Sequence, residues 1–252
     1  MITLDSLLSM MQLYPGGECP YIAGQSETIR ALRCPELPNV LHAGLMERGF
    51  RHSGDIFYVP ECEGCKKCLP MRIDPFAFRP SKKQRHIFNK NKDVEIWIES
   101  PELTDEIYDV YRRYMDYQHG DSHQGRSRQD LEDFLFQPLE SSVEIQYRLQ
   151  DRIIGVTIAD IIPNCAFSSV YHFFDPAYAR RSIGVYSVMA EIILCSTFNT
   201  PYYYLGYWVP GCKKMQYKAN YRPNQVLIDG KWVENSFSDD RQSCDPCSST
   251  LS

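Results

Sequence analysis

The chain has 252 residues, 43% of them hydrophobic and 23% charged, and its formal net charge is −5. This length allows a substantial core in one domain or two small ones, which excludes a small scaffold held together by disulfides. No run approaches the roughly 20 apolar residues of a membrane-spanning helix, and no secretory signal precedes the ten cysteines. We therefore expect a cytoplasmic protein with no membrane partner.

Three cysteines follow one another at intervals of three residues, after an aromatic-rich strand predicted for residues 49–60. They are Cys62, Cys65 and Cys68, and their spacing suits a zinc site, an iron–sulfur cluster, a redox dithiol or a disulfide scaffold. A metal site needs a fourth ligand, so we expect Cys19 to fold back beside them. The alternative is a set of reduced structural thiols, as a reducing cytosol favours.

A basic segment begins at Cys62, includes Cys65 and Cys68, and continues to residue 92. Between residues 62 and 92, nine lysines and arginines accompany two acids, a balance of +7 that leaves −12 for the rest of the chain. A basic island on an acidic body is typical of a surface that docks a polyanion such as RNA. The alternative is the solvated face of a basic helix, which residues 81–93 predict with Ser81 as the N-cap.

A strand and two helices are predicted next. Residues 94–99 have the composition of a strand, and residues 101–119 carry a single apolar stripe. Ser100 is expected to cap the helix over this stripe, because Pro101 then occupies its first position. A shorter helix is expected over residues 128–138, where the first half of the chain ends.

After residue 143 the pattern changes to three strand-like runs separated by turn residues, which predict an antiparallel meander. A helix beginning at Ser182, with Gly184 in its first turn, and an aromatic strand over residues 202–209 are expected to follow. Three strands, a helix and a strand in this order form the core of the GNAT acyltransferase fold, although many α+β proteins share the order.

The start of that helix is a candidate ligand site. Helix-start N–H groups point outward there, and a glycine lets a phosphate or carbonyl oxygen approach closely. GNAT enzymes hold the pyrophosphate of coenzyme A at this corner, but they use several glycines, whereas only Gly184 is present here. The alternative is an ordinary strand-to-helix turn.

Cations and aromatic residues alternate without any acid over residues 207–222. This combination suits an RNA end, whose phosphates bind cations and whose unstacked bases bind rings, and it also suits a peptide carboxylate. The alternative is that these aromatic side chains fill the core. The cations are Lys213, Lys214, Lys218 and Arg222.

Residues 235–252 are polar and poor in aliphatic side chains, so we expect disorder there. Cys244 and Cys247 form a Cys-x-x-Cys pair within this tail. An isolated pair in such a segment is expected to be incidental.

Four segments together carry a resemblance to a known family: residues 49–73, 81–93, 168–187 and 202–223. They resemble, in order, the aminoacyl-tRNA protein transferases of the N-degron pathway, in particular the bacterial aspartate/glutamate leucyltransferases, which are related to the arginyltransferases. The resemblance extends from about Tyr14 to Trp232.

The resemblance implies an α+β fold of two GNAT-like halves with mixed, largely antiparallel sheets: residues 1–140 with the cysteines and the basic segment, and residues 141–234 as the transferase half. It implies the transfer of an amino acid, leucine in the nearest relatives, from aminoacyl-tRNA to the N-terminal amine of proteins that begin with Asp or Glu. No cofactor is needed for this chemistry, although zinc or an iron–sulfur cluster is possible at Cys19, Cys62, Cys65 and Cys68.

Roles within this reaction follow from chemistry. Aminolysis of an ester is downhill and an α-amine is partly neutral at pH 7, so proximity and stabilisation of the oxyanion should supply most of the rate. We expect helix-start N–H groups at Ser182 to Gly184, or the Tyr186 hydroxyl, to bind the oxyanion. Tyr171 or Asp175 is expected to orient the amine and to receive its proton.

Cationic side chains are assigned to the charged parts of the two substrates. Arg72, Lys213, Lys214 and Lys218 are expected to bind the acceptor, and Lys82, Lys83 and Arg85 to bind tRNA. Two alternatives stay open: an arginyl donor with the same acceptors, and a metal-stabilised RNA-binding module without catalysis.

Overall fold

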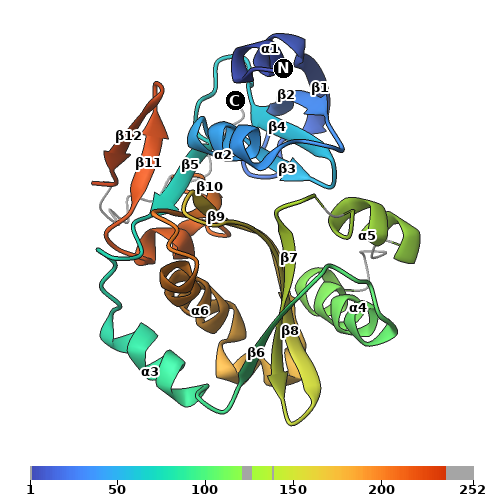
Figure 1. Cartoon of the computed structure of the whole chain (residues 1–252), viewed down its shortest axis with the longest axis vertical. Coiled ribbons are helices and arrows are strands. Elements are labelled where there is room, and N and C mark those ends of the chain that lie inside the picture. Colours follow the sequence, from blue (N-terminus) through green and yellow to red (C-terminus); the bar gives the residue numbers. More distant parts are fainter. Residues whose placement is uncertain (1, 121–126, 138, 237–252) are drawn as a thin grey trace, which may run out of the picture.

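The computed structural model describes residues 2–120, 127–137 and 139–236. Its strands form a four-stranded and an eight-stranded sheet, with helices packed against both (Figure 1). The expected mixed, largely antiparallel α+β fold is confirmed. The expected tail and its Cys-x-x-Cys pair lie almost wholly outside the described residues.

The small sheet is antiparallel, with strand order β1-β2-β4-β3. Its strands are β1 (Gln12–Glu18), β2 (Ser26–Arg33), β3 (Arg51–Ser53) and β4 (Ile56–Pro60). Helices α1 (Leu4–Met10) and α2 (Asn39–Glu47) pack with it around a core that contains Leu7, Leu45 and Phe57. This sheet therefore has a hydrophobic core of its own.

The large sheet has strand order β12-β11-β5-β10-β9-β8-β7-β6. Strands from both sides of residue 140 contribute to it. They are β5 (Leu69–Ile73), β6 (Glu95–Glu99), β7 (Ser142–Leu149), β8 (Arg152–Ile162), β9 (Ala166–Phe174), β10 (Tyr203–Trp208), β11 (Gln225–Ile228) and β12 (Lys231–Glu234).

One pair of neighbours in this sheet separates along its length. Strands β9 and β10 are parallel, and they pair only where Tyr203 and Tyr204 meet Phe167 and Ser168. Beyond these residues the backbones of β9 and β10 do not pair with each other. Side chains from other elements fill the gap between them. A cavity opens at this gap.

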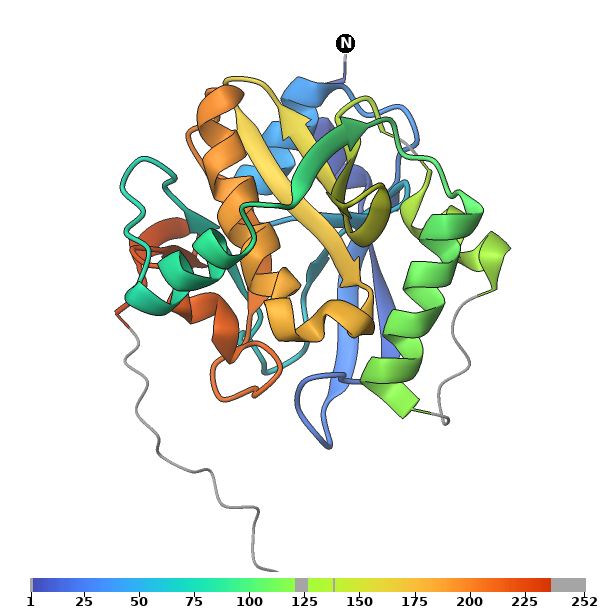
Figure 2. The same cartoon turned by 90° about the horizontal axis from the view of Figure 1, so that it is seen from below.

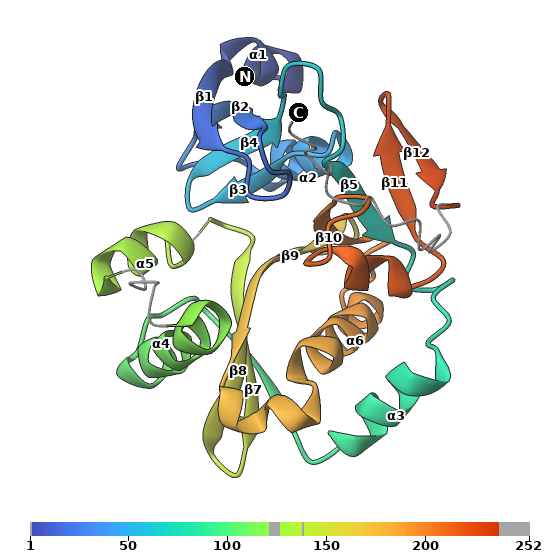
Figure 3. The ribbon, with the colours of Figure 1, turned by 180° about the vertical axis from the view of Figure 1, so that it is seen from behind.

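Helices cover both faces of the large sheet. Helix α6 (Ile183–Thr197) lies against one face with α3 (Lys82–Lys90) outside it, while α4 (Asp105–His119) and α5 (Arg128–Leu135) lie on the other (Figures 1 and 3). Nine of the fifteen residues of α6 are buried, because it is enclosed by the sheet and by α3. This burial explains why so few of its side chains are charged.

Most predicted elements are confirmed. Ser81 caps α3 through a reciprocal capping box with Gln84, and the meander is formed by β7, β8 and β9. The predicted start of α4 at Pro101 is wrong: the helix begins at Asp105, because the Thr104 side chain accepts a hydrogen bond from the Ile107 N–H and caps it.

The described helices include none whose length and apolar character would let it cross a membrane.

Candidate active site

A cavity of about 640 Å³ opens where β9 and β10 separate. Its walls come from the two parting strands, the first turn of α6, the end of α4 and the segment after β10, and the small sheet adds Tyr21, Arg51 and Tyr58. In Figure 2 the loop between β1 and β2, drawn in blue, extends toward the end of α4. The cavity therefore lies between the two sheets.

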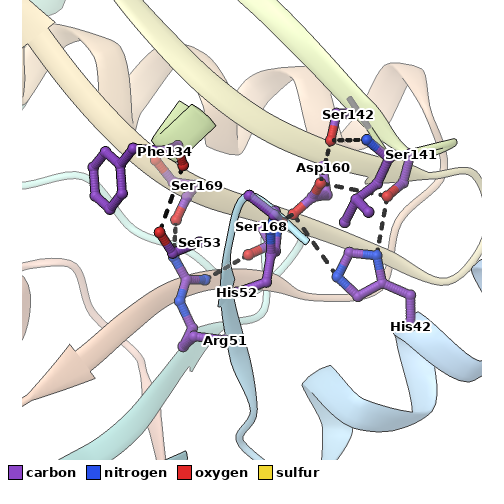
Figure 4. Close-up of polar contacts among 12 residues, drawn as sticks. His42, Arg51, His52, Ser53, Phe134, Ser141, Ser142, Asp160, Ser168 and Ser169 are labelled. Atoms are coloured by element: carbon purple, nitrogen blue, oxygen red, sulfur yellow. Dashed lines mark hydrogen bonds and ion pairs between the residues drawn. The ribbon is translucent and has the colours of Figure 1, made fainter. Parts of the chain in front are cut away.

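Arg51 of β3 reaches into the gap between β9 and β10. Its guanidinium donates to the Ser168 Oγ at 2.5 Å and to the backbone carbonyl of Ser169, both on β9 (Figure 4). A Cβ atom on Gly206 of β10 would lie 3.5 Å from the Arg51 Nε, and φ of Gly206 is +83°. The backbone conformation thus favours glycine there, whereas a contact of 3.5 Å is ordinary.

Lys218 joins Arg51 at the same place. It lies in the short helix η3 (Gln216–Asn220), and its buried ammonium donates to the Tyr207 carbonyl at 2.8 Å. A Cβ atom on Gly206 would lie 3.3 Å from Nζ, so Lys218 and Arg51 share this small region. Burial and, secondarily, Arg51 lower the pKa of Lys218 to about 7.

Neither cation has a carboxylate partner within ion-pair distance among the described residues. The buried ammonium of Lys218 has lost water, and the half-buried guanidinium of Arg51 beside it repels it. A bound carboxylate would relieve both penalties.

A buried ionic cluster holds the neighbour of Arg51. The His52 Nε2 donates to the Asp160 Oδ2 at 2.7 Å, and its Nδ1 faces the Gly54 carbonyl at 2.8 Å (Figure 4). Asp160 of β8 also accepts from the hydroxyl groups of Ser141 and Ser142. This cluster fixes β3 of the small sheet against β8 of the large one.

His42 completes the cluster from α2, with its Nδ1 3.0 Å from the Ser141 Oγ. Burial lowers the pKa of His42 to about 4, whereas the pKa of His52 is raised because the attraction and hydrogen bond of Asp160 outweigh its burial. Asp160 has a lowered pKa, since the two histidines and Arg51 outweigh its own burial. Three potential metal ligands do meet here, but the direct His52–Asp160 hydrogen bond and the buried surroundings indicate a salt-bridged hydrogen-bond cluster.

The first turn of α6 provides the other end of the cavity. Ser182 precedes it in the left-handed conformation (φ +57°) and makes no side-chain cap. The N–H groups of Ile183 and Gly184 have no hydrogen-bond partner within the described part of the chain, and both residues line the cavity. Two backbone donors are thus available to an oxygen atom there.

The structure brings five of the predicted residues to the cavity wall: Tyr171, Ser182, Gly184, Lys214 and Lys218. Four others lie elsewhere. Tyr186 is buried in the core with its hydroxyl 3.5 Å from the Val94 carbonyl, and Asp175 forms an ion pair with Arg113. Arg72 pairs with Glu47 and stacks on Tyr202 and Trp232, and Lys213 is exposed outside the cavity.

The predicted tRNA-binding residues lie on α3. Lys82, Lys83 and Arg85 are exposed, and Lys83 borders a second cavity of about 360 Å³. Val185 and Tyr217 line both cavities, so the two cavities adjoin. The basic helix α3 therefore lies across the second cavity from the first turn of α6.

The four cysteines are free thiols in one region. Burial raises the pKa of Cys68 to about 12, with further contributions from Cys19, Cys62 and Cys65, which places the other three near it. The Thr28 N–H donates to the Cys62 Sγ at 3.4 Å. Four thiols and a donor to sulfur suit a soft metal ion chemically. Among the described residues, however, only His42, His52 and Asp160 bring three potential ligand atoms within 4.8 Å of one another.

The sequence analysis does not select Arg51, Tyr58 or His172 as functional. Arg51 lies in the strand predicted for residues 49–60, where an arginine next to a histidine gives no sign of burial. His172 lies within the segment 168–187, and the signal that could have found it is a polar residue in a strand of otherwise apolar and aromatic side chains.

Family models match most of the chain. The model described as arginine-tRNA-protein transferase, N terminus, matches residues 17–86, and the model described as its C terminus matches residues 106–228. A distant structural likeness to L-PGS from Bacillus licheniformis (TM-score 0.45, 12% identity, 68% of this chain and 51% of that one) carries no weight for function.

Curated relatives are similar over nearly their whole length. Aspartate/glutamate leucyltransferase of Pseudomonas fluorescens strain Pf0-1 is 37% identical over 218 residues, which are 85% of this chain and 92% of the relative. The protein of the same name from Pseudomonas entomophila is 38% identical with the same coverage. The chain therefore belongs to the family of the arginine-tRNA-protein transferases, which confirms the resemblance of its motifs and makes it an aminoacyl-tRNA protein transferase.

Proposed function

We propose that this protein transfers leucine from leucyl-tRNA to the N-terminal amine of proteins that begin with Asp or Glu, and so marks them for degradation. The names of the curated relatives support both the donor and the acceptors. The observation that carries the proposal is the pair of cations, Arg51 and Lys218, at the cavity wall without a carboxylate partner among the described residues.

These two cations bind the side-chain carboxylate of the acceptor. The Arg51 guanidinium is held in place by β9, so its remaining N–H groups are oriented before the substrate arrives. Lys218 adds a charge that the bound carboxylate strengthens, because a nearby anion raises the pKa of a buried lysine. An acceptor that begins with Asn would leave both cations unpaired.

The ester of leucyl-tRNA lies at the first turn of α6. The N–H groups of Ile183 and Gly184 are suited to the oxyanion that forms when the acceptor amine attacks the carbonyl carbon. Proximity within the cavity supplies much of the rate, because a bimolecular reaction becomes effectively unimolecular. The basic face of α3 binds the phosphates of the tRNA.

The cavity lining favours leucine over arginine as the transferred amino acid. No aspartate or glutamate is among the residues that line either described cavity, whereas an arginyl side chain would need an anionic partner. Apolar side chains of Val185, Val188, Leu205 and Met215 line the main cavity instead. A leucyl side chain is desolvated favourably against such a wall.

One assay tests this function. The protein is incubated with labelled leucyl-tRNA or arginyl-tRNA and with peptides that begin with Asp, Glu or Asn. We expect label on the Asp and Glu peptides from leucyl-tRNA only. Transfer from arginyl-tRNA would identify an arginyl donor, and tRNA binding without any transfer would identify the non-catalytic RNA-binding alternative; either result contradicts the proposal.

A further inference from the structure

One nitrogen of His172 has no hydrogen-bond partner in the described part of the chain. His172 lies on β9 and lines the main cavity, and its Nε2 is shielded from water with no hydrogen-bond partner among the described residues. A Cβ atom on Gly184 would lie 4.0 Å from this Nε2. The unpaired nitrogen therefore faces the first turn of α6, where the proposed reaction takes place.

The other ring nitrogen is held by a buried relay. The His172 Nδ1 lies 2.9 Å from the Thr157 Oγ1, and the Thr157 hydroxyl donates to the Glu191 Oε1 at 2.9 Å. With Glu191 ionised, that hydroxyl gives its one hydrogen to Glu191, which makes the Nδ1 the donor to Thr157. The Nε2 of the neutral ring is therefore left with a lone pair.

Glu191 is well suited to the end of this relay. Its carboxylate is fully buried on α6 and accepts hydrogen bonds from Tyr147 at 2.9 Å and Tyr203 at 2.7 Å in addition to Thr157. Burial raises the pKa of Glu191 above its ordinary value, and the three hydroxyl donors offset that rise only in part. A positive charge on His172 would be compensated through Thr157.

Packing fixes the orientation of the imidazole. The ring stacks on Phe174 (centroids 6.2 Å apart, planes at 25°) and meets the edge of Tyr147. Burial lowers the pKa of His172 to about 4, so the ring of the free protein is neutral and a weak base, and a negative oxyanion formed beside it would raise this pKa. A fixed, neutral, unpaired acceptor at the edge of a cavity is the arrangement that a general base requires.

We propose that His172 is a catalytic residue of the transfer, as the group that takes the proton from the attacking amine; this inference rests on the proposed function. The neutral amine forms a bond to the leucyl carbonyl carbon, and the resulting ammonium gives its proton to the His172 Nε2. The imidazolium then protonates the ribose oxygen as the ester C–O bond breaks. The products are the amide and free tRNA, and His172 returns to its neutral form.

The test is a set of variants assayed with saturating leucyl-tRNA and an Asp-peptide. General base catalysis contributes about 10²- to 10⁴-fold, so His172→Gln and His172→Ala should lower kcat by about 100-fold or more with little change in either KM. Added imidazole should partly restore kcat of His172→Ala by occupying the space left by the ring, without accelerating the wild type. Thr157→Val, which removes the relay, should lower kcat about tenfold, whereas the exposed control Thr197→Val should not.

Gly184→Ala provides a variant that is expected to fold. Its methyl group would make an ordinary contact with His172, and alanine favours a helix more than glycine does. It should keep or raise the melting temperature while it covers the Nε2 and lowers kcat.

Two results would overturn the role of His172: folded His172 variants whose kcat stays within twofold of the wild type, or a lowered kcat that imidazole fails to restore. An inactive wild-type protein would instead contradict the proposed function itself, so the two failures are distinguishable.

Discussion

At the scale of single residues, the pKa of Lys218 should depend on whether the acceptor carboxylate is bound. With a pKa of about 7, lowered by burial and by Arg51, a substantial fraction of Lys218 is neutral in the free protein at pH 7.5. A bound carboxylate raises this pKa, so binding of an Asp-peptide should take up protons at that pH. Calorimetric titration in buffers of different ionisation enthalpy measures this uptake. The affinity should weaken as the pH rises above about 7, because neutral Lys218 attracts the carboxylate less.

Substitution at this pair should separate charge from structure. Lys218→Met and Arg51→Lys should each raise KM for Asp-peptides by about tenfold or more. The first removes a charged partner of the acceptor carboxylate, and the second keeps the charge but removes the planar fork of N–H donors. The matched controls Lys231→Met and Arg33→Lys change exposed residues outside the cavities and should leave KM unchanged. Equal rates for Asp- and Asn-peptides in the wild type would contradict carboxylate recognition by this pair.

Cationic side chains of the site could be predicted from the sequence, but the residues that pair with them could not. Lys214 and Lys218 were selected from their acid-free segment, and both line the cavity. Arg72 looked equally available in the sequence, yet Glu47 from α2 pairs with it, and no local pattern reveals a partner 25 residues away. The same limit applies to His172, whose importance depends on Thr157 and Glu191 from two other elements.

At the scale of elements, helix α3 places its basic face next to the cavity that adjoins the α6 corner. Changing Lys82, Lys83 and Arg85 together to Glu should raise KM for leucyl-tRNA and reduce its salt dependence, because fewer counterions are released; each lost phosphate contact lowers the log–log slope by about 0.7 to 0.9. Transfer rates at several salt concentrations measure this. An unchanged slope would mean that this face of α3 is merely solvated.

Elements with strong local signals were predictable, and those defined by distant partners were not. The meander has a turn residue with positive φ at each hairpin, Gln150 and Asp151 in one and Asn164 in the other, so its strands could be read from the sequence. Strand β5 was not predicted, because its partners β10 and β11 are remote in the chain. The β11–β12 hairpin is an exception: it was missed although Asp229 and Gly230, both with positive φ, form a two-residue turn that is a strong local signal. The gap between β9 and β10 likewise follows from pairing and not from composition.

At the scale of the whole molecule, the His52–Asp160 pair docks the small sheet on the large one. Asp160→Asn should lower the free energy of unfolding by about 3 to 5 kcal/mol, because it leaves a buried group without its charged partner. Chemical denaturation at pH 7 measures this loss. A loss below 1 kcal/mol would contradict the role of the pair in docking.

The pH dependence of this pair has a defined sign. His52 has a raised pKa in the fold, so its contribution to stability is complete below its unfolded value of about 6.5 and is lost as the pH rises through the folded value. Asp160 has a lowered pKa, so its contribution is lost only in acid. Above pH 6.5 the wild type should therefore lose stability with a slope that Asp160→Asn lacks.

The four cysteines act at the same scale, because they join the loop after β1 to the segment before β5. Tyr21 of that loop lines the cavity, and a metal ion bound by Cys19, Cys62, Cys65 and Cys68 would hold the loop in place by closing a long stretch of chain.

Protein purified without chelator should contain zinc or iron, measured by elemental analysis. Removal of the metal should abolish transfer while the strands and helices of the large sheet remain folded by circular dichroism, and Cys165→Ser, at an exposed cysteine outside the set, should change neither metal content nor activity. Metal-free protein with ten freely titrating thiols and full activity would show that these are ordinary cysteines, and that packing of the small sheet alone positions Tyr21.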